Sequence, residues 1–262
     1  MTFEFLDVQR IGPVERVMLN RPAVRNAFND RVIAELRDWA DRTAAASADV
    51  HIVVLSGAGK VFSAGADLDW MARGAALDHA GILAEARALH DMLEAIDRLP
   101  QAVVARVQGA AIAGGVGLTA VCDAVVAADD AIFGFSEVKL GIIPAVISPF
   151  VIRKIGQSAA RELFVTGAKF SAVRAFELGL VHRVAPADRL DEAIDAYVSE
   201  LRTSNPAAIG AAKALVRDVA ASGASDLFDI TGPALAERRM SSDATAGIRA
   251  FLEKRPATPG RK

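Results

Sequence analysis

Three short apolar runs constrain the fold of this chain more than any other feature. They are "HIVVLSG" (residues 51–57), "QAVVARVQG" (101–109) and "AVVAADD" (124–130), and each is followed by a turn or loop. Continuous apolar runs of this length are typical of strands that are buried on both faces, as in a parallel sheet. Because segments with helical patterns lie between the first two runs, the sequence predicts an α/β protein with a mainly parallel sheet.

The segments around these runs fit the same architecture. "VERVMLN" (14–20) predicts a further strand, and "DRVIAELRDWADRTAAA" has its apolar residues at helical spacing, with Asn29 as the expected N-cap. A second helix is expected over about residues 77–99, since Pro100 ends it. The stretch "GAGKVFSAGADLDWM" between them is rich in Gly and Ala, and we expect a loop there.

Helical patterns dominate the chain from about residue 157 onward. Asn205 followed by Pro206 is a favourable start for one of these helices, because Asn caps and Pro fits the first turn. We therefore expect an α/β core over residues 1–190 and a C-terminal helical region over residues 191–262. Such a region covers an active site or builds an oligomer interface.

Composition excludes several classes of function. The formal net charge of the 262 residues is −2, which gives no reason to expect a nucleic-acid or acidic-membrane partner. Cys122 is the single cysteine, so an intramolecular disulfide and a cysteine-based metal cluster are excluded. The N-terminus has no secretory h-region, and no apolar run reaches 18 residues. We expect a cytoplasmic protein with no metal site and no membrane span.

Two Gly- and Ala-rich loops and one acid form the candidate site. "SAGADLDWM" and "QGAAIAGGVG" each follow a buried run, and small residues there let a ligand approach backbone N–H groups. Glu137 is the only acid of "FGFSEVK", directly before the apolar "LGIIPAVISPF". A carboxylate in an apolar wall has a raised pKa that suits proton transfer. The alternative is a buried acid held by an ion pair, with Lys139 or an arginine.

Several motifs in order carry a resemblance to a known family. They are "VMLNRPAVRNAF", "VFSAGADLDWM", "VQGAAIAGGVGLTAVCDAVVAADDAIFGFSEVKLGIIP", "ARELFVTGAKFSAVRAFELGLVHRV" and "GIRAFLEKR". Over nearly its whole length the chain resembles the crotonase superfamily, the enoyl-CoA hydratase/isomerase family. The resemblance implies a spiral of ββα units, assembly into homotrimers or homohexamers, an acyl-CoA thioester substrate, and no metal or redox cofactor.

The resemblance also implies roles for individual residues. The N–H groups of Ala66 and Gly114 would form an oxyanion hole, and Glu137 would be catalytic. Further positions are implied in binding the thioester, pantetheine, phosphates and adenine of CoA: Arg25, Ala64, Gly65, Ala66, Asp67, Leu68, Gly114, Phe251 and Lys254.

The chain departs from the family pattern at two places. Hydratases of the family normally carry a second glutamate 20 residues before the first, and here that position is Gly117. "IIPAVISPF" replaces a Gly-rich run, and this text resembles both the methylglutaconyl-CoA hydratase subgroup and single-glutamate isomerases. We expect an enoyl-CoA hydratase acting on a branched 2-enoyl-CoA. The alternatives are an enoyl-CoA double-bond isomerase and a non-catalytic member that binds acyl-CoA.

Overall fold

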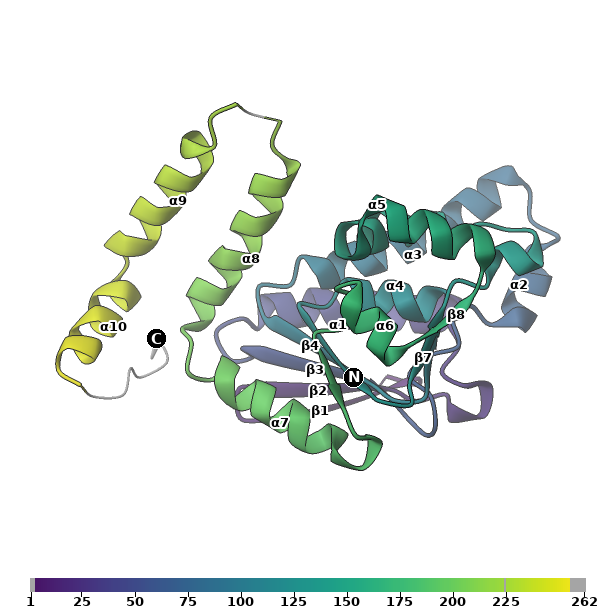
Figure 1. Ribbon diagram of the computed structural model, residues 1–262, viewed down its shortest axis with the longest axis horizontal. Helices are drawn as coiled ribbons and strands as arrows, with labels where there is room; N and C mark the ends of the chain where they lie inside the picture. Colours follow the sequence, from purple (N-terminus) through teal and green to yellow (C-terminus); the bar gives the residue numbers. More distant parts are fainter. Residues whose placement is uncertain (1–2, 224, 255–262) are drawn as a thin grey trace.

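The computed structural model describes residues 3–223 and 225–254, and it is an α/β protein with two sheets (Figure 1). The strands are β1 (Leu6–Ile11), β2 (Val14–Leu19), β3 (Ile52–Gly57), β4 (Ala102–Val107), β5 (Ala110–Ile112), β6 (Ala124–Ala128), β7 (Ile132–Gly134), β8 (Lys169–Ser171) and β9 (Arg183–Ala185). The helices are α1 (Asp30–Ala45), α2 (Leu68–Gly74), α3 (His79–Asp97), α4 (Gly114–Ala120), α5 (Ser148–Thr166), α6 (Ala172–Glu177), α7 (Leu190–Leu201), α8 (Pro206–Ala221), α9 (Phe228–Met240) and α10 (Ser242–Leu252).

The larger sheet has the order β1-β2-β3-β4-β6-β9. Only β1 and β2 pair in the antiparallel sense, and the remaining pairs are parallel, with Ile52 opposite Ala102 and Val104 opposite Ala124. The three apolar runs are thus adjacent buried strands, which confirms the mainly parallel α/β fold predicted from them. A smaller sheet has the order β5-β7-β8. Its strands β5 and β7 directly follow β4 and β6 along the chain.

Helices cover the larger sheet on both sides. In Figure 1, α1, α3 and α5 lie above the sheet and α7 lies below it. Helix α1 presents its apolar stripe to the core, where Leu36 and Trp39 are almost completely buried, and the Asn29 side chain caps it as predicted by accepting from the Val32 N–H. Helix α3 ends three residues before Pro100, in line with the predicted helix boundary.

The C-terminal helices α8, α9 and α10 extend away from the sheets (Figure 1). The Asn205 side chain caps α8, as its sequence predicts, by accepting from the Ala208 N–H. No residue described in α8 or α9 is buried within the single chain, whereas α7 packs on β4 and β6. The expected division of the chain at residue 190 stays a prediction, with α7 beside the core and α8–α10 forming a projecting arm.

Two sequence-based expectations were wrong or incomplete. The loop expected over "GAGKVFSAGADLDWM" ends in helix α2, which begins at Leu68 because the Asp67 carboxylate caps it. Strands β1, β5, β7, β8 and β9 were not predicted, and four of these five have only three residues, too few to show a periodic pattern. Within residues 3–223 and 225–254, none of the helices combines the length and apolar character needed to cross a bilayer.

Candidate active site

A single pocket of about 730 Å³ gathers most of the residues expected to be functional. It lies where the loops before α1, before α2, before α4 and before α5 meet. Of the expected residues, the pocket is lined by Arg25, Ala64, Ala66, Asp67, Leu68, Gly114 and Glu137. Trp70 and Ile147 line it as well. The size is in the range of pockets that hold organic ligands.

A buried asparagine holds two of these loops together. Asn26 has a φ of 55°, a left-handed conformation that Asn tolerates better than most residues. Its side-chain Nδ2 donates to the carbonyls of Ala58 and Val61, each at 2.9 Å. The buried Ser63 hydroxyl donates to the Asn26 carbonyl at 2.9 Å and accepts from the Gly65 N–H at 3.2 Å. The loop before α2 is therefore fixed by fully partnered polar groups.

An ion pair between Arg21 and Asp67 adds to this support. Arg21 donates from one guanidinium nitrogen to Asp67 at 3.0 Å and to the Ala27 carbonyl at 2.7 Å. The other Asp67 oxygen accepts from the N–H groups of Asp69 and Trp70. Burial raises the pKa of Asp67, but these hydrogen bonds and the Arg21 charge outweigh it and leave the pKa below its ordinary 3.8. Asp67 is therefore an ionised structural carboxylate.

The backbone on either side of Ala66 is paired with another strand segment. Phe28 donates to the Gly65 carbonyl at 2.7 Å, and Asp67 donates to the Phe28 carbonyl at 2.8 Å. Among the described residues, no hydrogen bond is formed by the Ala66 N–H between them. Gly65 has a φ of 87°, and a Cβ there would lie 2.7 Å from the Ile112 carbonyl oxygen, so only glycine fits beside β5.

The second expected donor, Gly114, begins helix α4. The preceding Ala113 has a φ of 50° and a ψ of −115°, a strained conformation for a residue with a side chain, and its N–H donates to the Gly134 carbonyl at 2.8 Å. The Gly114 N–H has no protein acceptor within the described part of the chain. Two free N–H groups, those of Ala66 and Gly114, thus belong to residues of one pocket, as an oxyanion hole requires.

Glu137 lies in the pocket wall at the start of a short 3₁₀ helix (Glu137–Leu140). Its exposed fraction is 9%, and its Oε2 atom has no hydrogen-bond partner. Burial raises the pKa of Glu137 above its ordinary 4.5. Within residues 3–223 and 225–254 Glu137 forms no ion pair, so the structure does not contain the alternative pair with Lys139 or an arginine.

Gly117, the position of the expected second acid, is buried in α4 and does not line the pocket. A Cβ built there would overlap the Cγ2 methyl group of Ile147. Of the described pocket-lining residues from 112 to 147, Glu137 is the one carboxylate, and the apolar Ile147 lies beside position 117.

Phe251 and Lys254, the two expected tail residues, lie outside this pocket. Phe251 is in the last turn of α10, Lys254 follows that helix in the projecting arm, and both are exposed. Within one chain the structure does not bring them to the other site residues. Their contact with the adenine end of CoA stays a prediction.

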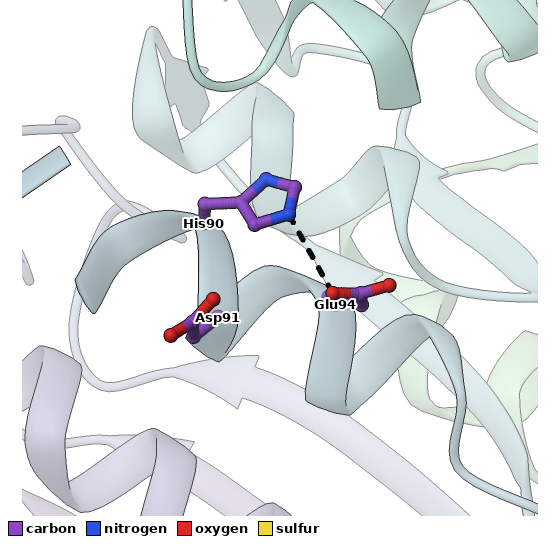
Figure 2. A group of neighbouring side chains, drawn as sticks. All are labelled: His90, Asp91 and Glu94. Carbon is purple, nitrogen blue, oxygen red and sulfur yellow. Dashed lines mark ion pairs between the residues drawn. The ribbon is translucent and has the colours of Figure 1, made fainter. Parts of the chain in front are cut away.

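A group of possible metal ligands, His90, Asp91 and Glu94, lies on α3 (Figure 2). His90 Nε2 is 3.5 Å from a Glu94 oxygen, and the Arg98 guanidinium is 2.9 Å from the other Glu94 oxygen. The hydrogen bond from Arg98 holds the pKa of Glu94 below its ordinary value. These contacts are ordinary ion pairs between residues one helical turn apart.

The sequence-based reasoning missed several residues that shape the site. Arg21, Asn26 and Ser63 were not expected to be functional, and Lys139 and Lys169 also line the pocket. The signal for Asn26 and Ser63 is weak, because buried polar side chains are recognised only when their backbone partners are known.

The enoyl-CoA hydratase/isomerase family model matches residues 11–260. An enoyl-CoA hydratase of Alternaria alternata is 37% identical over 211 residues, covering 80% of this chain and 68% of that protein. The crystal structure of an enoyl-CoA hydratase from Shewanella pealeana matches with a TM-score of 0.93 at 35% identity, covering 97% of this chain and 96% of that one.

A second solved structure, of an enoyl-CoA hydratase from Mycobacterium smegmatis, has a TM-score of 0.92 at 35% identity, covering 97% and 98% of the two chains. The fold and the pocket define a crotonase-type protein, and the predicted fold class is confirmed. The chain belongs to the enoyl-CoA hydratase/isomerase family.

Proposed function

We propose that the protein is an enoyl-CoA hydratase that acts through a thioester enolate. One observation carries the proposal: the buried Glu137 carboxyl group, with an unpartnered oxygen, shares a pocket with the free N–H groups of Ala66 and Gly114. The names of the similar proteins support the same activity. The resemblance of "IIPAVISPF" makes branched 2-enoyl-CoA esters the first substrates to test.

The proposed mechanism needs only one carboxylate. The N–H groups of Ala66 and Gly114 donate to the thioester oxygen. Ionised Glu137 accepts a proton from water as the water oxygen bonds to C3, and the C2=C3 electrons move onto the thioester oxygen to form the enolate. Glu137 then returns its proton to C2, so that one water molecule is added in total. The unpaired oxygen of Glu137 suits a group that exchanges a proton twice.

A second candidate, an enoyl-CoA isomerase, is favoured by the apolar surroundings of Gly117. Position 117 is a glycine and Ile147 fills the space beside it, so the described residues supply no second acid that could hold a water molecule there. In this reaction Glu137 removes a proton from C2 of a 3-enoyl-CoA, the N–H groups stabilise the dienolate, and Glu137 delivers the proton to C4. Net composition is unchanged, and water takes no part.

Product analysis separates the two candidates. The purified protein is incubated with branched and unbranched 2-enoyl-CoA and 3-enoyl-CoA esters. The products are separated by liquid chromatography against authentic isomers and identified by mass spectrometry. A hydratase yields 3-hydroxyacyl-CoA, which is heavier by one water, whereas an isomerase interconverts the two enoyl esters at constant mass. Glu137→Gln is the matched control. Absence of both products with every ester would contradict the proposal.

We further propose that Arg25, exposed at the pocket edge, contacts the CoA phosphates. Soluble CoA esters at 100 times their Kd should stabilise the folded state by about 2.7 kcal/mol through mass action. The melting temperature should therefore rise by several degrees, and by less with Arg25→Gln. NAD and ATP are the comparison ligands.

The proposal includes a trimer-based homo-oligomer and a cytoplasmic setting, without a metal or redox cofactor. Exposed apolar side chains of the arm support the oligomer, among them Val216, Leu235, Met240 and Phe251, each at least 66% exposed. Light scattering that gives a monomer mass at micromolar concentration would contradict it. Turnover should be unchanged by a chelator, and cell fractionation should recover the activity in the cytoplasmic fraction.

A further inference from the structure

The packing between α4 and the start of α5 shows an unusual complementarity. Gly117 is buried, and a Cβ built on it would overlap Cγ2 of Ile147 and lie 3.0 Å from Ile147 Cβ. The next neighbour, Leu93 Cδ1, is 3.8 Å away, an ordinary contact. Ile147 alone therefore takes up the room that a side chain at position 117 would need.

The backbone around Ile147 is held by short-range hydrogen bonds. Its carbonyl accepts from the N–H groups of Phe150 and Val151 at 3.1 and 3.0 Å. The Ser148 hydroxyl donates to the Ala145 carbonyl at 2.8 Å, and Pro149 occupies the first turn of α5. Because the side chain is only 3% exposed and its backbone is fixed, Ile147 has little freedom to move aside.

Ile147 also lines the pocket that holds Glu137. We propose that Ile147 is a specificity-determining residue: its side chain occupies the space shared with position 117 and thereby sets the size of the acyl-binding part of the pocket. The inference rests on the proposed acyl-CoA function. It also implies that Gly117→Glu, made alone, has no room for the new carboxylate.

The packing half of the inference is tested by a double-mutant cycle on stability. Gly117→Ala alone should lower the melting temperature by on the order of 5 °C, because the new methyl group meets Ile147. In an Ile147→Ala background the same change should cost clearly less, since the overlapping Cγ2 methyl group is gone and only the Cβ of residue 147, 3.0 Å away, remains. Ile155→Ala is the matched control, since Ile155 is buried on α5 outside the pocket. If Gly117→Ala lowered the melting temperature as much in the Ile147→Ala background as in the parent, the inference would be overturned.

The proposed role in specificity is tested by the ratio of kcat/KM for a branched ester to kcat/KM for its unbranched homologue. A residue with only a structural role would not change this ratio. Ile147→Ala should raise kcat/KM for a 3-alkyl-branched ester relative to its unbranched homologue by about tenfold or more, the usual effect of one or two methylene groups in an apolar pocket. Adding Gly117→Ala refills part of the space, so the ratio should return toward the parent value. Ile155→Ala should leave it unchanged.

The outcomes separate this inference from the proposed function. If the parent converts none of the esters, the proposed function is wrong, and the ratio of the two ester Kd values by calorimetry then tests Ile147. If the parent converts them and Ile147→Ala leaves the ratio unchanged, only the role of Ile147 is wrong.

Discussion

Two walls of the same pocket each contain a carboxylate, and the two carboxylates differ in their hydrogen-bond partners. The loop wall, residues 21–28 and 61–67, holds Asp67 with the Arg21 guanidinium and two backbone N–H groups. The acid wall, residues 136–147, leaves an oxygen of Glu137 without a partner. The pKa of Asp67 is accordingly lowered, and that of Glu137 is raised.

The contrast shows how environment assigns a role to an acid. A carboxylate whose oxygens are all engaged remains ionised and fixes the loop around it, whereas a buried carboxylate with a free oxygen is able to accept and release a proton. Proximity to the pocket alone does not distinguish Asp67 from Glu137. The number of hydrogen bonds that each one accepts does.

The largest expected effect is on turnover in Glu137→Gln. The substitution keeps the shape and removes the base, so kcat should fall by about 10²- to 10⁴-fold, while binding of a CoA ester stays near the parent value. Stopped-assay kinetics and calorimetry measure the two quantities. The exposed Glu177→Gln is the matched control. A folded Glu137→Gln enzyme with normal turnover would mean that Glu137, like Asp67, is a structural carboxylate, and the contrast between the two walls would be wrong.

A somewhat smaller loss is expected for Gly114→Val. A Cβ at Gly114 would lie 3.2 Å from the Phe28 ring, and the added methyl groups would block the approach of a thioester to the N–H group. Turnover should fall by about 10²- to 10³-fold, the usual cost of one oxyanion donor. Gly247→Val, on α10 with open space around it, is the control. Near-normal activity would show that the oxyanion hole lies elsewhere.

Asp67→Asn should act mainly on stability. The amide cannot compensate the Arg21 charge, and a hydrogen bond to a charged group contributes about 1.5–3 kcal/mol. We expect the melting temperature to fall by about 5 °C, with a smaller loss of turnover than in Glu137→Gln. Scanning calorimetry checks this, with the exposed Asp69→Asn as the control. If Asp67→Asn lowered turnover without lowering the melting temperature, Asp67 would take part in the reaction together with Glu137.

The smallest expected effect is the pH dependence of stability. Because the folded pKa of Glu137 is raised above 4.5, the unfolded chain ionises first as pH increases. The parent should therefore lose stability from about pH 4.5 up to the folded pKa, relative to Glu137→Gln, and the difference should stay constant above it. Melting temperatures of both proteins across this range measure it. A difference of opposite sign would mean that Glu137 is stabilised as the anion.

Much of the fold was predictable because its signals are local. The runs that became β3, β4 and β6, the Asn29 and Asn205 caps, and the break before Pro100 each depend on a few adjacent residues. Glu137 was indicated by its place as the one acid before an apolar run, whereas Ala66 and Gly114 came from motifs in the family resemblance. The pocket lining includes all three.

Other features depend on contacts between distant segments. The Asn26 side-chain N–H groups donate to residues more than 30 positions away. Gly117 is restricted by Ile147, which follows it by 30 positions. The sequence indicates that an acid is missing at position 117, but only the packing identifies the side chain that fills its place. Three-residue strands such as β5 and β7 likewise form only because β4 and β6 bring them together.

The backbone at Ala113 has a consequence for protein engineering. A residue with a side chain at φ 50° and ψ −115° carries a conformational cost of about 1–3 kcal/mol, which a glycine would relieve. Ala113→Gly is thus a substitution that a screen for heat resistance would select. The same substitution would widen the range of directions open to the neighbouring Gly114 N–H group. Selection for thermal tolerance alone would therefore favour Ala113→Gly at the expense of turnover. A screen that also measures turnover would retain the alanine.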